Sequence, residues 1–147
     1  MGIRFEGDFE VERSPQDTFD FLSDPEKFAP FLPGFEEVEA DGERNWTLKL
    51  KVGVSQIKGA ATVKLHLEES QPPERAHYRG KGKLAAGSVN IKTGFDLEET
   101  EAGTQVKWHG EIQVFGRLAS LGGGLLKPLA RKNIQELIDS LQEALAS

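Results

Sequence analysis

The chain has 147 residues, a net charge of −6 and no cysteine. The acidic balance argues against a dedicated nucleic-acid binder, and the lack of cysteine excludes disulfide bonds, thiolate metal sites and thiol nucleophiles. A chain of this length can form a substantial core, and we expect a single domain over residues 1–147.

The first predicted elements are a strand and two short helices. Apolar and polar side chains alternate over residues 3–11, which is the pattern of a strand with one buried face. Ser14-Pro15 offers a capping side chain and a proline at the first helical position, so a short helix should begin there. Asp24-Pro25 repeats this start for a second short helix, and Pro33-Gly34 ends it.

A long alternating stretch from Trp46 to Val114 predicts an antiparallel meander. Turn signals lie at 41–42, 55–58, 71–74, 84–87 and 102–103, so we expect six strands after the two helices. The inward face of these strands is apolar but unusually small. Its small residues are Gly59, Ala61, Ala76, Gly80, Gly82 and Gly110.

The C-terminal part of the chain changes character. Residues 116–121 form a short apolar bridge, residues 122–124 are three glycines that predict a break, and residues 125–145 have an apolar stripe at helical spacing. The order of elements predicts an α+β helix-grip fold. In it, a curved seven-stranded antiparallel sheet, two short helices and a long C-terminal helix enclose a hydrophobic cavity.

Several local motifs point to a known family. They are Phe5-Glu6-Gly7, Asp24-Pro25-Glu26-Lys27-Phe28 followed by Leu32-Pro33-Gly34, Lys51-Val52-Gly53-Val54, Gly80-Lys81-Gly82, and the segment 116–122. With them the chain resembles the family of the CoxG subunit of carbon monoxide dehydrogenase (CoxG-like). This family belongs to the START-like, or SRPBCC, superfamily, which shares the helix-grip fold of Bet v 1-like proteins.

That resemblance implies a cavity for a lipid-like or isoprenoid-quinone-like molecule. In some members it also implies help in maturing a molybdenum-containing dehydrogenase or in docking it to a membrane. It implies no cofactor and no established catalytic residue.

The glycines of the inward face have two interpretations. They can let the strands coil and approach the long helix, or they can leave volume for a ligand. On the second interpretation, Tyr78, Thr93 and Asn133 are the few polar contacts. The predicted cavity wall is Trp46, Leu50, Tyr78, Gly80, Ile91, Phe95, Trp108, Gly110, Leu126, Leu129, Asn133 and Leu137.

Aromatic side chains gather around the two short helices and can act in two ways. They can plug one end of the core, or they can gate a cavity mouth that faces the three glycines before the long helix. For the gate, the predicted mouth residues are Phe28, Phe31, Gly122 and Gly123.

Nothing in the sequence predicts a catalytic or metal site. His66, His77 and His109 fall on the outward face of separate strands without a metal-binding spacing. The serines lack a nucleophile-elbow motif. We therefore expect a binding protein and not an enzyme. A cyclase or hydrolase would need an acid or base inside the cavity, and the alternation places none there.

The outward face is rich in lysine, which keeps a sheet soluble and protects its edges. The same face could dock on an acidic partner or on the anionic inner leaflet of the membrane. The cations are Lys49, Lys51, Lys58, Lys64, Arg79, Lys81, Lys83, Lys92 and Lys107. The alternative function is therefore an accessory factor for maturation or membrane recruitment of a CO-dehydrogenase-like redox enzyme.

The N-terminus lacks the basic-then-apolar pattern of a secretory signal, and no apolar run approaches the roughly 18 residues of a membrane span. We expect a cytoplasmic protein. On the docking alternative it would be peripheral at the inner face of the membrane.

Overall fold

The computed structural model describes residues 2–54 and 57–146. Strand β1 (Gly2–Val11) is followed by α1 (Pro15–Leu22), α2 (Pro25–Phe28) and the short 3-10 helix η1 (Ala29–Phe31). The remaining strands are β2 (Phe35–Ala40), β3 (Asn45–Val54), β4 (Ile57–Gln71), β5 (Arg75–Leu84), β6 (Gly87–Glu99) and β7 (Thr104–Phe115). The 3-10 helix η2 (Gly116–Leu121) leads into α3 (Gly123–Ala146). Of the predicted turn at 55–58, residues 55 and 56 lie outside the described residues.

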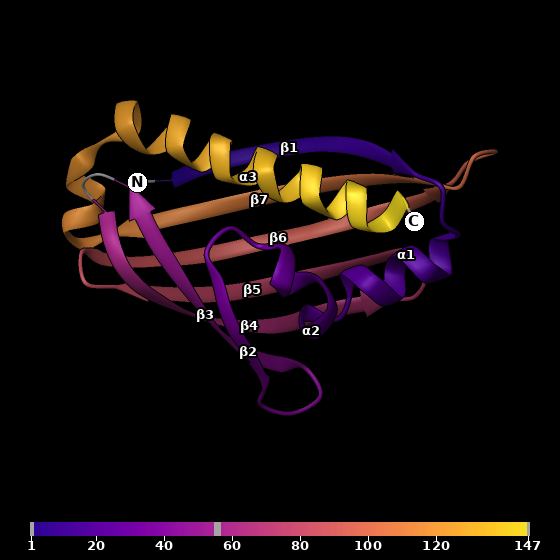
Figure 1. Ribbon diagram of the computed structural model, residues 1–147, viewed down its shortest axis with the longest axis horizontal. Coiled ribbons are helices and arrows are strands. Elements are labelled where there is room, and N and C mark those ends of the chain that lie inside the picture. Colours follow the sequence, from indigo (N-terminus) through magenta and orange to yellow (C-terminus); the bar gives the residue numbers. More distant parts are fainter. Residues whose placement is uncertain (1, 55–56, 147) are drawn as a thin grey trace.

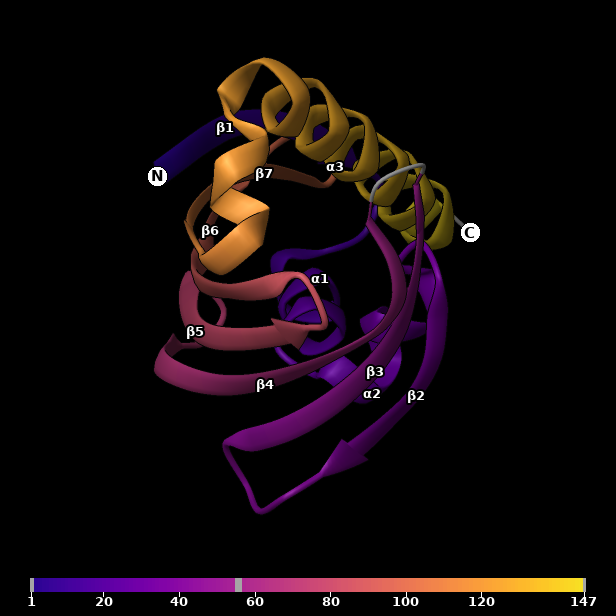
Figure 2. The same cartoon turned by 90° about the vertical axis from the view of Figure 1, so that its left-hand side faces the viewer.

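The strands form one antiparallel sheet in the order β1-β7-β6-β5-β4-β3-β2. β1 pairs with β7, so the first and last strands of the chain are neighbours. α3 runs along the sheet on the side of β1 and β7 (Figure 1). Viewed from the end, the strands curl into an open arc, with α1 and α2 inside it and α3 above (Figure 2). The predicted α+β helix-grip architecture is confirmed.

Local sequence sets the starts of both short helices as expected. The Ser14 hydroxyl accepts a hydrogen bond from the Asp17 backbone N–H at 3.1 Å, and the Asp24 carboxylate accepts one from the Glu26 N–H at 3.0 Å. A proline follows each cap at the first helical position, where its missing N–H is not needed.

The long helix begins earlier than predicted. α3 starts at Gly123, so of the three glycines only Gly122 lies outside it. The N–H groups of Leu125 and Leu126 both reach back to the Gly122 carbonyl, at 3.3 and 3.0 Å, and this closes the first turn over the glycines. No helix in the described part of the chain is both long enough and apolar enough to cross a membrane.

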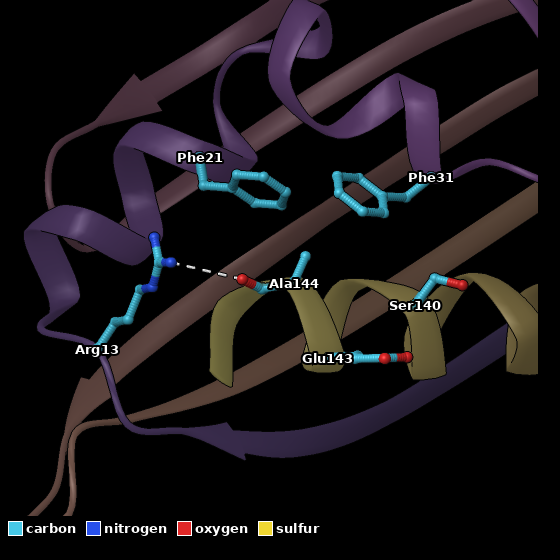
Figure 3. Close-up of a pocket in the computed structure, with 6 residues that line it drawn as sticks. All are labelled: Arg13, Phe21, Phe31, Ser140, Glu143 and Ala144. Carbon is cyan, nitrogen blue, oxygen red and sulfur yellow. Dashed lines mark hydrogen bonds between the residues drawn. The ribbon is translucent and has the colours of Figure 1, made fainter. Parts of the chain in front are cut away.

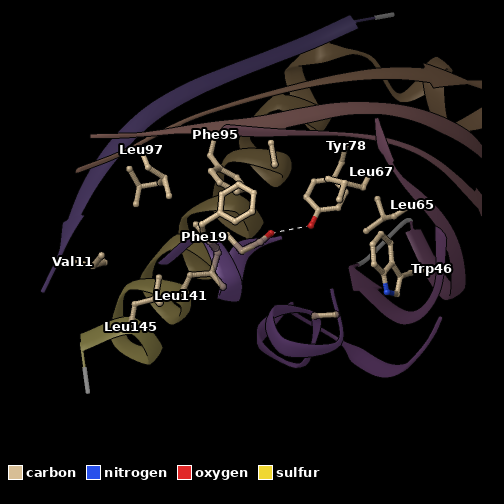
Figure 4. Packing of buried hydrophobic residues seen from close by; sticks show 14 of the residues in the cluster. Val11, Phe19, Trp46, Leu65, Leu67, Tyr78, Phe95, Leu97, Leu141 and Leu145 are labelled. Atoms are coloured by element: carbon tan, nitrogen blue, oxygen red, sulfur yellow. Dashed lines mark hydrogen bonds between the residues drawn. The ribbon is translucent and has the colours of Figure 1, made fainter. Parts of the chain in front are cut away.

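The core divides into two clusters at opposite ends of α3. The large cluster packs α1, α2 and the C-terminal part of α3 on the sheet, and it includes Phe9, Val11, Phe19, Trp46, Leu48, Tyr78, Phe95, Val106, Leu141 and Leu145 (Figure 4). The small cluster packs η2 and the N-terminal part of α3, through Ile3, Val114, Leu118 and Leu126. Thr93 and Gly110, which lie on the inward face between the two clusters, belong to neither of them and are only half-buried.

Candidate functional site

Three adjacent rows across the sheet carry the predicted wall residues of β5, β6 and β7. The strand register places Thr93 of β6 between Tyr78 of β5 and Gly110 of β7, and Gly110 opposite Phe5 of β1. The two flanking rows contain Gly80, Ile91 and Ile112 on one side and Ala76, Phe95 and Trp108 on the other. Among the predicted wall residues, the sheet therefore brings together a group of neighbours, namely Tyr78, Gly80, Ile91, Phe95, Trp108 and Gly110.

The middle of this inward face is only half-buried. Inward-facing residues near the strand ends are nearly inaccessible, such as Val106 at 1% and Val114 at 4% exposure. By contrast, a patch between them keeps water-accessible surface although it faces the interior. We call this the central patch, and it consists of Phe5, Ile91, Thr93, Trp108, Gly110 and Ile112. On α3, the side chains of Leu129, Ala130, Ile134, Leu137 and Ile138 are half-buried as well.

The glycines of the inward face play different roles. A Cβ at Gly80 would lie 2.9 Å from Leu65 Cδ2, and one at Gly82 would lie 2.8 Å from Val89 Cγ2, so neighbouring side chains already use that space. At Gly110 the nearest atom to an added Cβ is Thr93 Oγ1, at 3.8 Å. Gly59 is exposed and has a φ of +127°, so its role is in the backbone. Of these glycines, Gly110 is the one that borders open space on the inward face.

The predicted polar contacts are mostly engaged elsewhere. The Tyr78 hydroxyl donates to the Leu22 carbonyl at 2.9 Å and so fixes the end of α1 on the sheet (Figure 4). The Thr93 hydroxyl donates to the His109 carbonyl at 2.8 Å. Asn133 is exposed on α3 and belongs to neither core cluster. An apolar wall therefore remains, with few polar groups to offer.

The environment of Tyr78 makes a testable prediction about pH. Burial, with a smaller effect of the nearby Asp24 carboxylate, raises the pKa of Tyr78 well above its ordinary value of 10.0. Above a pH of about 10 the unfolded chain loses the phenol proton while the folded chain keeps it. The free energy of unfolding should therefore fall by up to about 1.4 kcal/mol per pH unit. Tyr78 is the only tyrosine, so phenolate absorbance reports it directly.

We expect the folded protein to show almost no phenolate near pH 11, and Tyr78→Phe to remove that part of the alkaline loss of stability. Urea unfolding of both proteins at several alkaline pH values measures the difference. Equal slopes for the two proteins, or ordinary phenolate formation, would contradict it. The variant should also lose about 1–3 kcal/mol at neutral pH, because the buried Leu22 carbonyl is left without its donor.

Trp108 carries an unusual polar group. Among the described residues, its indole Nε1 is buried and has no hydrogen-bond partner. The edge of the ring lies against Gly7, where an added Cβ would be 2.8 Å from Cζ2 and 3.1 Å from Nε1. Gly7 thus makes room for the indole on the edge strand. The alternation of apolar and polar residues predicted Trp108 in the cavity wall, but it could not predict that the indole N–H would have no acceptor.

The other predicted wall residues lie farther apart. Leu126 is buried in the small cluster, and Leu129 packs against that cluster. Leu137 and Leu50 pack against the large cluster, which contains Trp46. The residues predicted from α3 thus extend from one end of the helix to the other, on both sides of the central patch.

The predicted mouth is not one place, and this prediction needs correction. Phe31 lines a pocket of about 520 Å³ with Arg13, Phe21, Ser140, Glu143 and Ala144, near the C-terminal end of α3 (Figure 3). Gly122 and Gly123 lie at the N-terminal end of α3. At 1.5 Å per residue the two places are about 30 Å apart along the helix, so the aromatic residues cannot face these glycines.

The aromatic residues around the short helices have two different roles. Phe19 packs edge-on against Phe95, with ring centroids 5.9 Å apart, and Phe28 packs edge-on against Tyr78 at 6.0 Å. These two rings plug the core. Phe31 is 39% exposed and packs at 5.9 Å on Phe21, so this pair forms the rim of the pocket in Figure 3. Phe28 therefore belongs to the core, and Phe31 remains a candidate mouth residue.

His77 and His109, which the sequence places on separate strands, are in contact on the outward face of the sheet. His77 and His109 lie on either side of Gly94 in the register, and their ring centroids are 5.2 Å apart. They meet because Gly94 has no side chain; an added Cβ would overlap the His77 ring. Glu69 pairs with His77 at 3.2 Å. Within the described residues, no group of three or more His, Asp or Glu side chains is arranged to hold a metal ion.

A curled seven-stranded antiparallel sheet that grips a long C-terminal helix, with an apolar inward face, defines a START-like helix-grip protein. A family model described as the CoxG subunit of carbon monoxide dehydrogenase matches residues 7–146, so the chain belongs to the CoxG family. No curated protein matches the chain.

Solved structures share the fold at low sequence identity. A conserved protein from Geobacillus kaustophilus is 22% identical, with a TM-score of 0.87 over 97% of this chain and 95% of that one. A START superfamily protein from Mycobacterium smegmatis is 11% identical, with a TM-score of 0.72 over 98% and 96%. The di-domain ARO/CYC StfQ from the steffimycin biosynthetic pathway is 14% identical, with a TM-score of 0.69 over 99% of this chain and 50% of StfQ.

Proposed function

We propose that this protein binds a hydrophobic small molecule, lipid-like or isoprenoid-quinone-like, between the sheet and α3 and does not transform it. The observation that carries the proposal is the half-buried central patch, because apolar side chains that face an interior are normally packed to near-complete burial. A ligand that covers this patch would complete the core between the two clusters. Gly110, which borders open space, would lie beneath the ligand.

The chemistry of the inward face favours binding over catalysis. Around the central patch, the inward rows of β1 and β3–β7 carry no charged side chain; Glu99, which the register places in these rows, lies exposed at the end of β6. General acid–base catalysis needs a titratable group within hydrogen-bond reach of the substrate. The Tyr78 phenol, whose pKa is raised by burial, is held by the Leu22 carbonyl.

A second candidate function is docking on an acidic partner, such as a redox enzyme complex or the anionic inner face of the membrane. Lys64 and Lys81 lie directly opposite each other on neighbouring strands, and both are exposed. Like charges in this position destabilise a sheet, so a partner that neutralises them would compensate. Lys83 and Lys51 are exposed on the same face, whereas Lys49 is already paired with Glu37 at 3.1 Å.

Native mass spectrometry of the purified protein, followed by organic extraction, tests the proposal. We expect a mass above that of the bare chain and release of a stoichiometric hydrophobic compound. A bare mass that does not change after incubation with lipid and quinone mixtures would overturn the binding function. That outcome would leave the docking function as the better account of the family resemblance and the lysine face.

A further inference from the structure

On the inward face of the sheet, two hydroxyl donors are already used within the protein and one indole donor is not. The Tyr78 and Thr93 hydroxyl protons are both used on backbone carbonyls. The Trp108 N–H is buried and, within the described part of the chain, unpartnered. An indole N–H can only donate a hydrogen bond. Around the central patch, the inward face therefore offers an unused donor and no charged side chain.

A buried donor without a partner is unfavourable, because its hydrogen bond to water is lost on folding and not replaced. Such a group favours any molecule that brings an acceptor to it. Binding of an ionised ligand is unfavourable at such a site, because burying a charge without a counter-charge costs much free energy. The uncharged rows around the central patch thus select against carboxylates and phosphates and select for neutral molecules.

We propose that the ligand is a neutral apolar molecule with a hydrogen-bond-accepting oxygen, such as a ketone, ester or quinone carbonyl, and that this oxygen accepts from Trp108 Nε1. This inference rests on the proposed binding function and names the ligand class. The apolar body of the ligand covers Gly110 and Ile112, which follow Trp108 by two and four residues on β7. It also covers Ile91, which lies opposite Ile112 on β6.

Gly7 determines where the Trp108 donor lies on the sheet. Gly7 is exposed and lies on the edge strand β1, directly opposite Trp108 in the register. The ring edge that carries Nε1 fills the space that a side chain at Gly7 would occupy, so the unused donor lies at the β1 side of the inward face.

The test compares three probes of equal chain length on delipidated protein: 2-decanone, decane and decanoate. By calorimetry, 2-decanone should bind about tenfold more tightly than decane, as expected for one buried hydrogen bond, and decanoate should bind more weakly than 2-decanone at neutral pH. Trp108→Phe keeps an aromatic ring at this position but removes the indole N–H donor. It should abolish the preference for 2-decanone and change decane binding less than about twofold.

A second measurement does not depend on that variant. In Trp46→Phe, Trp108 is the remaining tryptophan, and its emission should shift to longer wavelength with 2-decanone but not with decane. Equal binding of decane and 2-decanone, an emission unmoved by 2-decanone, or tightest binding of decanoate would overturn the inference while leaving a hydrophobic binding function in place. If none of the probes binds, the proposed function itself fails.

Discussion

Gly110→Leu should weaken ligand binding by about 200-fold and leave the fold intact. An added Cβ at Gly110 meets only Thr93 Oγ1 at 3.8 Å, so the leucine side chain extends into the space beside the central patch. There it takes the volume of about four ligand carbons. At about 0.8 kcal/mol per methylene this is about 3 kcal/mol, or a loss of affinity of about 200-fold.

The measurement is native mass spectrometry of the variant as purified, together with titration of delipidated protein with 2-decanone. Gly124→Leu is the matched control, because nothing lies within 4 Å of an added Cβ at this exposed position in α3. The control should bind like the wild type. Unchanged binding by a folded Gly110→Leu would show that the ligand lies elsewhere. Gly80→Leu is a poorer test, since its side chain would first have to displace Leu65.

Gly34→Ala should cost about 3 kcal/mol or more of folding stability. Gly34 has a φ of +74°, and an added Cβ would overlap the Lys51 carbonyl oxygen on β3. The Gly34 carbonyl also accepts a hydrogen bond from the Lys51 N–H at 2.7 Å. Any shift that relieves the overlap therefore breaks the contact that holds the end of the short helices against the sheet.

Gly42→Ala separates this clash from simple backbone strain. Gly42 also has a positive φ, of +118°, but nothing lies within 4 Å of an added Cβ there. We expect this control to cost only about 1–2 kcal/mol in urea unfolding. Similar losses for the two variants would mean that the contact between Gly34 and Lys51 contributes little to stability.

The arrangement of the elements could be predicted because the signals that define them are local. The caps at Ser14 and Asp24, the alternation from Trp46 to Val114 and the apolar stripe of the last helix each depend on residues a few positions apart. Such signals determine which residues face inward. The predicted start of α3 is two residues late, because glycines that indicate a break can also take helical conformations when the next turn closes over them.

The sequence by itself thus determined the α+β helix-grip fold, the family resemblance and an inward face that is apolar, has small side chains and carries almost no titratable groups. Only the tertiary structure decided which of its glycines border open space, because Leu65 and Val89 fill the positions above Gly80 and Gly82 from neighbouring strands. It also separated Phe31 from Gly122 along the length of α3, brought His77 to His109 across Gly94, and left Trp108 Nε1 without a partner among the described residues. Each of these depends on strand register and on the path of α3 over the sheet, which residues far apart in the chain set together.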